Sequence, residues 1–335
     1  MKVLVTGNLG YVGSVLFKML KNQNFLVDGY DIGYFPQSLD KSEITQPKYD
    51  IRNISESDLK DVDAICHLAA LSNDPLGELN SNLTYDINYN STVNLAKIAK
   101  KSGVRYFVFS SSCSSYGSND EIVDETSELL PLTAYAKSKV LAEQELLKLK
   151  DEHFYPVNLR SATAYGMSPN LRLDLVVNNL TGSAVSTGNV KLLSDGNAWR
   201  PLVHVEDMAN AFITILKSKS DKISGEVFNV GGNSDNYSVK EIAEMVESII
   251  PNSTISFSEN ASKDSRSYKV NFDKIKNELG FIPKRKLSES ILELYRTFTE
   301  IELDENLFSD KIFYRVKYIK WLMDQKIVNS ELRFS

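Results

Sequence analysis

A tyrosine and a lysine four residues apart are the side chains of this sequence best suited to chemistry. Tyr135 and Lys139 lie in Thr-Ala-Tyr-Ala-Lys-Ser-Lys, and this spacing places both on one face of a helix. A tyrosine near its ordinary pKa of about 10 is a poor base at neutral pH, but a neighbouring ammonium group favours the phenolate. The pair is therefore suited to removing a proton from a bound hydroxyl group.

A run of serines offers a third group. Residues 108–117 read Val-Phe-Ser-Ser-Ser-Cys-Ser-Ser-Tyr-Gly and extend from a predicted strand. Ligands of parallel sheets bind beyond the carboxyl ends of the strands. A serine here can hold the substrate oxygen while its proton moves. The run alone does not single out one serine for this role.

Three glycines near the start of the chain predict a dinucleotide site. Gly7, Gly10 and Gly13 separate a predicted strand, 2–6, from a predicted helix, 11–21. Glycine permits the tight turn and the close approach of the backbone to a pyrophosphate, and the helix N-terminus offers free N–H groups and partial positive charge. The glycine spacing differs from the older dinucleotide fingerprint, but the physical requirement is the same.

Asp31 ends the second predicted strand, 25–31. A carboxylate at this position can accept hydrogen bonds from the adenosine ribose 2′-hydroxyl and would repel a 2′-phosphate. NAD is therefore favoured over NADP. Asp28 is a competitor, although it lies within the strand. The positive nicotinamide ring of NAD would add to the effect of Lys139 on the Tyr135 phenol.

The pattern of apolar residues predicts an α/β protein with a Rossmann-type, doubly wound parallel sheet in residues 1–165. Further strands are expected at 64–68, 104–110 and 155–160, and helices at 82–102 and 133–152. Residues 166–300 are expected to form a smaller, mixed substrate-binding lobe that partly returns to the core, with helices at 206–217, 238–250 and 287–299. Residues 301–335 are interpreted as a helical C-terminal extension packed on the body, with an oligomer contact as the alternative.

Composition narrows the class of protein. A net charge of −6 argues against a broad nucleic-acid surface. Two cysteines, Cys66 and Cys113, exclude a disulfide framework, and the three histidines lack metal-ligand spacing. Residues 1–7 reach glycine and polar residues too early for a signal peptide, and no apolar run is long enough to span a membrane. We therefore expect a cytoplasmic protein with no bound metal and no membrane or nucleic-acid partner.

Taken together, these motifs resemble the extended short-chain dehydrogenase/reductase family, which includes sugar-nucleotide epimerases and dehydratases; the likeness extends over residues 1 to about 295. It implies that Ser112, Tyr135 and Lys139 are catalytic, with the adjacent Ser111 as the alternative serine. In the family, the segment matching Asp50-Ile51 contacts adenine, the turn matching 68–70 lines the cofactor, and the asparagine matching Asn88 steadies the active site. The implied cofactor-binding residues are Gly7, Asn8, Leu9, Gly10, Tyr11, Val12, Gly13, Asp31, Asp50, Ile51, Leu68, Ala69, Ala70, Asn88, Ser110, Tyr135 and Lys139.

The resemblance also implies a nucleotide-sugar substrate and a homodimer paired through helices 82–102 and 133–152. Asn178 and Asn179 match a segment that binds the substrate's phosphates, and Arg200 matches an arginine that grips its pyrophosphate. Arg266 is a second candidate, with a solvated loop charge as the alternative. Ser112, Cys113 and Thr163 complete the expected substrate contacts.

Two departures from the family pattern bear on the reaction. The 4,6-dehydratases carry an Asp-Glu pair where this chain has Cys113 and Ser114, so dehydration is disfavoured. The UDP-galactose epimerases carry an asparagine where this chain has Thr163, so the usual UDP-hexose pattern is broken. Cys113 could act as an acid or base in epimerisation if its pKa were lowered; the alternative is a small packed residue.

Three functions are open at this point. The first is an NAD-dependent nucleotide-sugar epimerase that works through a transient keto-sugar and regenerates its cofactor. The second is a nucleotide-sugar 4-dehydrogenase or ketoreductase, which uses the same residues but changes the redox state of the sugar. The third is an NAD-binding scaffold without activity, which an intact Ser112, Tyr135 and Lys139 argues against.

Overall fold

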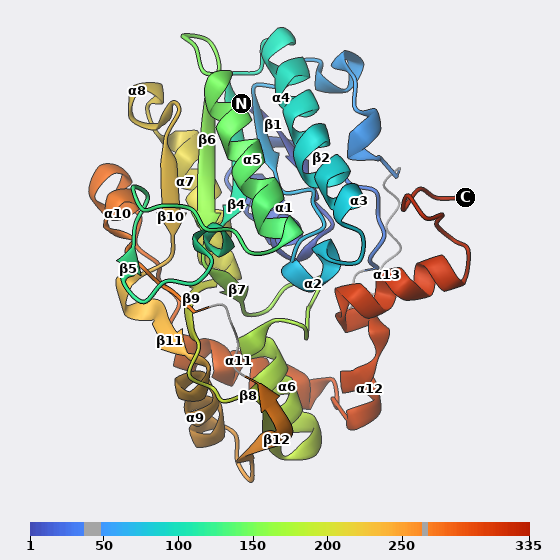
Figure 1. The fold of residues 1–335 in the computed structure, drawn as a ribbon. Helices are drawn as coiled ribbons and strands as arrows, with labels where there is room; N and C mark the ends of the chain where they lie inside the picture. Colours follow the sequence, from blue (N-terminus) through green and yellow to red (C-terminus); the bar gives the residue numbers. More distant parts are fainter. Residues whose placement is uncertain (37–47, 263–266) are drawn as a thin grey trace.

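The first half of the molecule is built around a parallel β-sheet (Figure 1). The computed structural model describes residues 1–36, 48–262 and 267–335. Within these ranges six strands lie in the order β10-β6-β4-β3-β1-β2, and each pair of neighbours is parallel. They are β1 (Lys2–Thr6), β2 (Leu26–Tyr30), β3 (Ala64–His67), β4 (Tyr106–Ser112), β6 (Tyr155–Ser161) and β10 (Val227–Val230). The strand order reverses direction beside β1, which makes a ligand crevice there and confirms the predicted doubly wound sheet.

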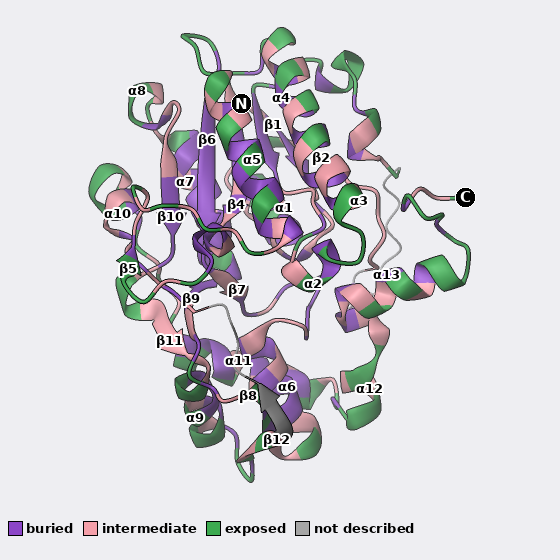
Figure 2. Cartoon of the chain, viewed as in Figure 1, coloured by how far each residue is buried: buried purple, intermediate pink, exposed green. Residues whose placement is uncertain are grey.

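Helices cover both faces of this sheet, and Figure 2 shows the buried strands between them. Helices α1 (Tyr11–Asn22) and α7 (Val205–Lys217) pack together on one face, and α4 (Ser91–Lys101) and α5 (Ala134–Lys148) cover the other. Successive side chains of a strand point to opposite faces of the sheet. Val3 and Val5 of β1 therefore pack in the apolar cluster under α1 and α7, and Leu4 packs in the cluster under α4 and α5.

One predicted helix is interrupted. Residues 82–102 were expected to be continuous, but α3 (Ser81–Tyr85) is joined to α4 by a π-helical turn at Asp86–Asn90. The Ser91 hydroxyl donates to the Asp86 carbonyl at 2.8 Å within this turn. Such turns recur at functional sites, and this one carries Asn88.

The second lobe has its own apolar core. Helices α6 (Val176–Thr187), α9 (Val239–Ile249) and α11 (Leu287–Glu300) enclose it with β8 (Asn189–Ser194), which pairs with β12 (Thr254–Ser262). A small sheet of β7 (Thr163–Tyr165), β9 (Trp199–His204) and β11 (Asn236–Ser238) joins the lobes. From this half of the chain α7 and the unpredicted strand β10 return to the large sheet.

Short elements complete the described chain: α2 (Asp74–Gly77), α8 (Ser220–Ile223), α10 (Asp273–Leu279), α12 (Glu305–Ser309), and β5 (Ile122–Val123), which pairs with β13 (Lys269–Val270). None of the helices in the described ranges is long and apolar enough to cross a membrane.

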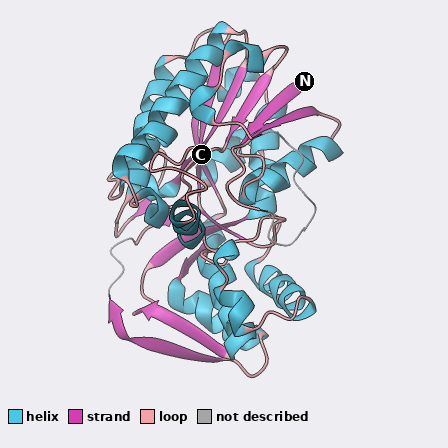
Figure 3. Cartoon of the chain, turned by 90° about the vertical axis from the view of Figure 1, so that its right-hand side faces the viewer, coloured by secondary structure: helices cyan, strands magenta, loops and turns pink. Residues whose placement is uncertain are grey.

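The C-terminal extension packs against both lobes: α12 contacts α6 of the second lobe, and α13 and the tail join the first. Helix α13 (Arg315–Asp324) contributes Ile319 and Leu322 to the apolar cluster that also contains α4, and Val328 and Leu332 of the tail join the same cluster. In Figure 3 the C-terminus faces the viewer over this side of the molecule. The extension is thus positioned to contribute residues to the crevice at the sheet edge.

Candidate active site

A cavity of about 630 Å³ opens at the carboxyl ends of the parallel strands, a volume ordinary for a small-molecule site. Its walls come from the glycine loop, β4, α5, the loop before α6 and the start of α13. The predicted site residues that line it are Gly7, Leu9, Gly10, Tyr11, Val12, Gly13, Asp31, Asp50, Ile51, Leu68, Ala69, Ala70, Ser110, Ser112, Tyr135, Lys139, Thr163 and Arg200.

Two glycines of the loop are required by their surroundings. Gly7 has φ +75°, and a Cβ there would lie 2.8 Å from the Ala69 nitrogen. A Cβ on Gly13 would lie 1.9 Å from the Gly7 carbonyl oxygen, so α1 begins directly against the turn. This bare backbone at a helix N-terminus fits the pyrophosphate of NAD. Asn8 is directed elsewhere, since its amide packs against Gly29 of β2 and is 3% exposed.

Asp31 closes the same end of the cavity. Its carboxylate accepts hydrogen bonds from the Leu9 nitrogen at 3.0 Å and the Gly33 nitrogen at 2.8 Å. Burial raises the pKa of this carboxyl, and the two backbone N–H groups oppose that rise. Asp31 therefore fixes the glycine loop as well as lining the cavity. Asp28, the alternative, forms a surface ion pair with Lys2.

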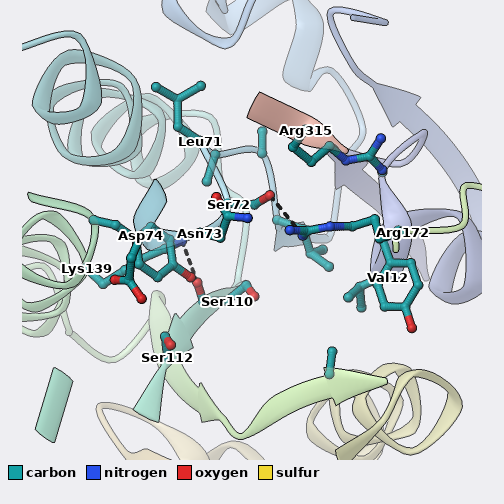
Figure 4. Close-up of a pocket in the computed structure, with 18 of the residues that line it drawn as sticks. Val12, Leu71, Ser72, Asn73, Asp74, Ser110, Ser112, Lys139, Arg172 and Arg315 are labelled. Carbon is teal, nitrogen blue, oxygen red and sulfur yellow. Dashed lines mark hydrogen bonds between the residues drawn. The ribbon is translucent and has the colours of Figure 1, made fainter. Parts of the chain in front are cut away.

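Lys139 is buried at the opposite end of the cavity (Figure 4). Its Nζ donates to the Ser110 carbonyl at 2.7 Å and lies 5.7 Å from the centre of the Tyr135 ring. Burial lowers the pKa of Lys139 to about 7, and Glu143 opposes the shift. Burial thus disfavours the ammonium form of Lys139. Ionisable groups of active sites often have pKa values shifted in this way.

The Tyr135 phenol remains protonated at neutral pH in this structure. Burial raises its pKa to about 12, the charge of Asp74 raises it further, and hydrogen bonding to Ser112 and the charge of Arg172 lower it. Loss of solvent around the ring is thus the largest effect, and the pKa is raised rather than lowered as the sequence analysis expected. A phenolate at this position requires further positive charge, which the nicotinamide ring of a bound NAD would supply.

The structure distinguishes the two candidate serines. The Ser111 hydroxyl donates to the Glu143 carboxylate, which also binds Arg160. Both serines line the cavity, but the Ser112 hydroxyl is not bound to a carboxylate and accepts hydrogen bonds from the Ser114 nitrogen at 3.1 Å and the Ser114 hydroxyl at 2.9 Å. Ser112 therefore keeps the better position for contacting a ligand oxygen.

Three other predicted residues lie behind the walls rather than in them. Asn88 bonds the backbone of Leu71 at 2.8 and 3.1 Å and the Ser138 hydroxyl at 3.3 Å, so it braces two walls against each other. Asn178 and Asn179 bond to backbone groups of the loop before α6. These side chains are occupied by contacts within the protein, and contact of Asn178 and Asn179 with a substrate stays a prediction.

Cys113 also points away from the cavity. It belongs to the apolar core, and its thiol donates to the Arg160 carbonyl at 3.1 Å. Burial raises the pKa of the thiol, which is opposite to the lowering that acid–base use requires. The structure thus favours the packed-residue interpretation. Arg266 lies outside the described residues.

Charged residues that the sequence analysis missed also line the cavity, among them Arg172, Asp174 and Arg315. Arg172 donates to the Asp174 carboxylate at 2.8 and 3.1 Å, and both belong to the loop before α6. The Arg315 nitrogen donates to the same carboxylate at 3.3 Å. The pairing of Arg172 with Asp174 two residues later was readable as a local signal, but nothing in the sequence connects either residue with Arg315.

Comparison with known proteins finds relatives that are similar in sequence and in fold. UDP-glucuronic acid decarboxylase 6 of Arabidopsis thaliana is 28% identical over 306 residues, which cover 87% of this chain and 87% of that protein. The structure of MoeE5 in complex with UDP-glucuronic acid and NAD matches with TM-score 0.78 and 27% identity, covering 89% of this chain and 99% of that chain. UDP-glucuronic acid 4-epimerase from Bacillus cereus, in complex with UDP-glucuronic acid and NAD, matches with TM-score 0.75 and 26% identity, covering 90% and 100%.

The family assignment rests on a longer match than any single motif. Residues 3–231 match the sequence profile described as the NAD dependent epimerase/dehydratase family. The match confirms the resemblance drawn from the motifs, the expectation of an enzyme and the expectation of NAD as its cofactor. The chain belongs to the NAD dependent epimerase/dehydratase family.

Proposed function

We propose that this protein is an NAD-dependent nucleotide-sugar epimerase that works through a transient keto-sugar. One observation carries the proposal: Ser112, Tyr135 and Lys139 lie on the walls of the same cavity as the glycine loop. A sugar hydroxyl bound beside Tyr135 would therefore face the cofactor. The Arg200 guanidinium lines the cavity as well and is the proposed anchor for the substrate's pyrophosphate.

In the proposed mechanism Ser112 holds the sugar oxygen and Tyr135 accepts its proton. Lys139, fixed by the Ser110 carbonyl, stabilises the resulting phenolate electrostatically. NAD supplies the hydride acceptor and donor at this site. In the return step the keto-sugar presents its other face, and Tyr135 gives the proton back to the same oxygen. The sugar is inverted at one carbon, and no net oxidation occurs.

Dehydration is less well supported by the residues present. At the positions where the 4,6-dehydratases carry a carboxylate pair, Cys113 is turned into the core and Ser114 is hydrogen-bonded to Ser112. A carboxylate does lie near Tyr135, since Asp74 lines the cavity and accepts from the Thr133 hydroxyl at 2.6 Å. Asp74 belongs to α2 and not to the serine run, so it is not in the position of the dehydratase pair. Because a carboxylate is nevertheless near Tyr135, the product analysis also looks for the dehydrated sugar.

Decarboxylation of a nucleotide uronic acid is the second candidate, and the similarity to UDP-glucuronic acid decarboxylase 6 favours it. Oxidation of the 4-hydroxyl of such a sugar creates a ketone β to the carboxylate. That arrangement loses CO₂ readily and leaves an enolate, whose carbon takes up a proton from solvent in place of the carboxylate. The cofactor would return its hydride to the ketone while Tyr135 returns the proton to the oxygen, so no net oxidation occurs. The same catalytic residues would then serve a different product.

The deciding experiment begins with the purified protein stripped of small molecules. It is supplied with UDP-glucuronic acid or UDP-glucose and a catalytic amount of NAD, and the sugar products are identified by mass spectrometry and NMR. An epimer of unchanged mass supports the proposal, and release of CO₂ supports the second candidate. Turnover that stops after one equivalent of NAD would instead indicate a dehydrogenase or ketoreductase. Tyr135→Phe is the inactive control, with Tyr85→Phe on α3 as its matched variant.

The proposal extends to the location and the oligomeric state of the protein. We propose a cytoplasmic homodimer paired through α4 and α5. On α5, Leu141 is a large apolar side chain with 38% of its surface exposed. Light scattering of the wild type and of Leu141→Glu tests the pairing: a monomeric wild type would contradict it.

A further inference from the structure

Arg315, the first residue of α13, is a buried cation with an unused donor. Its side chain lines the cavity and is 2% exposed. Nη2 donates to the side-chain amide oxygen of Asn170 at 2.8 Å, and the guanidinium carbon lies 4.0 Å from the centre of the Phe35 ring. Within the described part of the chain, Nη1 has no hydrogen-bond partner. Buried polar groups are normally satisfied, so this donor indicates a place for a bound acceptor.

The Asn170 contact places Arg315 next to the glycine loop. The Asn170 amide nitrogen donates to the Leu9 carbonyl at 2.7 Å, so one side chain connects the guanidinium to the loop backbone. Asp31 also interacts electrostatically with Arg315. Figure 4 shows Arg315 and Arg172 in the same cavity, projecting from separate elements. The position of the free donor is therefore the cofactor end of the cavity.

The tail that follows α13 bonds to the neighbouring segment expected to contact adenine. The Arg333 Nη1 donates to the Asp50 carboxylate at 3.1 Å, and the Arg52 Nη1 donates to the Glu331 carbonyl at 2.7 Å. The Tyr34 hydroxyl donates to the Leu332 carbonyl. Thus Arg315 lies beside the glycine loop, which would hold the pyrophosphate. The tail contacts the segment at 50–52, which would hold the adenosine.

We propose that the C-terminal extension completes the NAD site, with Arg315 Nη1 donating to the diphosphate of the bound dinucleotide. A diphosphate oxygen supplies the missing acceptor, and a charge-assisted hydrogen bond to guanidinium is among the stronger polar contacts in proteins. Residues 331–333 of the tail hold the segment at 50–52 against the adenosine of the bound dinucleotide. The consequence is slow release of NAD, which suits an enzyme that regenerates its cofactor. The inference rests on NAD as the cofactor and not on which sugar is processed.

A nucleotide sugar carries a diphosphate as well, so the two sources must be separated. Wild-type protein and Arg315→Gln are stripped of NAD, and their affinities for NAD, adenosine and UDP are measured by calorimetry. Arg315→Gln is expected to raise the Kd for NAD by about 10- to 100-fold, the range for loss of one charged hydrogen bond. Binding of adenosine and UDP should be unchanged. Arg296→Gln, an exposed arginine on α11, is the matched control.

Two outcomes overturn the proposal. If NAD affinity is unchanged, Arg315 does not contact the dinucleotide. If UDP binding weakens and NAD binding does not, the guanidinium serves the substrate's diphosphate.

A second measurement on the wild type does not depend on the variant folding. Hydrogen exchange is compared with and without NAD, and NAD is expected to slow exchange at 311–320 and 328–335. Unchanged exchange in both segments, in protein shown to bind NAD, overturns the role of the extension. Because NAD binding itself is the reference in each experiment, failure of this inference is distinguishable from failure of the proposed function.

Discussion

Arg160 on β6 and Arg315 on α13 are both buried, but their surroundings differ. Arg160 donates through Nε and Nη2 to the Glu143 carboxylate, with a shortest distance of 2.7 Å, and through Nη1 to the Tyr116 hydroxyl at 3.1 Å. Although burial alone would lower it, the charge and hydrogen bonds of Glu143 hold the Arg160 pKa above its ordinary value. For Arg315, burial and the nearby Arg172 lower the pKa to about 9, against opposing effects of Asp174 and Asp31.

The difference shows how to separate structural charge from ligand-binding charge in one molecule. A buried cation whose donors are all satisfied by the protein belongs to the folded core, and removing its partner leaves a charge without compensation. A buried cation with a donor left over in a cavity wall is arranged for something that is not part of the chain. The two arginines therefore predict opposite responses to mutation.

The largest expected effect is at the fully partnered site. Glu143→Gln leaves the Arg160 guanidinium buried without its carboxylate and should destabilise the protein by about 3–5 kcal/mol. Urea unfolding measures the change. Glu145→Gln is the control, since Glu145 pairs with Lys148 at the surface of the same helix, where a pair contributes about 0–1 kcal/mol. Equal effects of the two variants would refute a special role for the buried pair.

Lys139 extends the comparison to a cation buried for catalysis, and its effect depends on pH. Its folded pKa of about 7 lies below the ordinary 10.5, so between these values the unfolded chain binds more protons and wild-type stability falls as pH falls. Lys139→Met removes this cost, and we expect it to stabilise the protein by about 2–4 kcal/mol at pH 7. The gain should disappear as pH approaches 10.5.

Thermal and urea unfolding from pH 6 to pH 10.5 test this expectation. The exposed Lys137→Met on the same helix is the control and should show no comparable trend. Activity should fall in Lys139→Met at every pH, because the group that favours the phenolate is gone. A variant that is less stable than the wild type at pH 7 would contradict the burial argument.

The same contrast explains what the sequence could and could not predict. The glycine loop and the Tyr135–Lys139 pair are local patterns whose geometry follows from a turn and a helix, so their place in the cavity was predictable. The strand β10 was missed because it is a four-residue element far along the chain from its partner β6. Arg315 was missed because its site is formed by chain segments distant in sequence, and no spacing records their meeting.

The direction of a side chain could not be predicted from the sequence where neighbouring groups compete for its hydrogen bonds or packing. Cys113 follows Ser112 directly, yet the 3₁₀ turn at Cys113–Tyr116 carries the thiol into the core. Asn178 was matched to a phosphate-binding segment, but its amide is taken up by the Gly166 and Arg172 backbone. A family motif identifies a segment more reliably than it identifies the atom that meets the ligand.

Asp174 gives an intermediate prediction between the two arginine sites. Its carboxylate accepts from Arg172 at 2.8 Å and from the Asn73 amide at 3.2 Å, at the cavity wall rather than in the core. Asp174→Asn should destabilise the protein by about 1–3 kcal/mol, since hydrogen bonds to a charged group are lost but solvent or an anion can compensate Arg172. Urea unfolding should show a smaller loss when NAD is added. A loss as large as that of Glu143→Gln would place Asp174 with the structural pairs.

The last prediction concerns Arg315, where the expected change in the unliganded protein is opposite in sign to that of Glu143→Gln. Arg315→Met replaces a buried cation that lacks a full set of partners with an apolar chain, and its lowered pKa means that the buried charge costs stability, so without NAD the variant should be at least as stable as the wild type. With NAD at about 100 times its Kd, the wild type should gain about 2.7 kcal/mol, and a variant that binds about 30-fold more weakly should gain about 0.9 kcal/mol. Urea unfolding with and without NAD measures both quantities. If Arg315→Met destabilises the unliganded protein as strongly as Glu143→Gln does, the protein itself satisfies Arg315, and the two arginines would serve the fold in the same way.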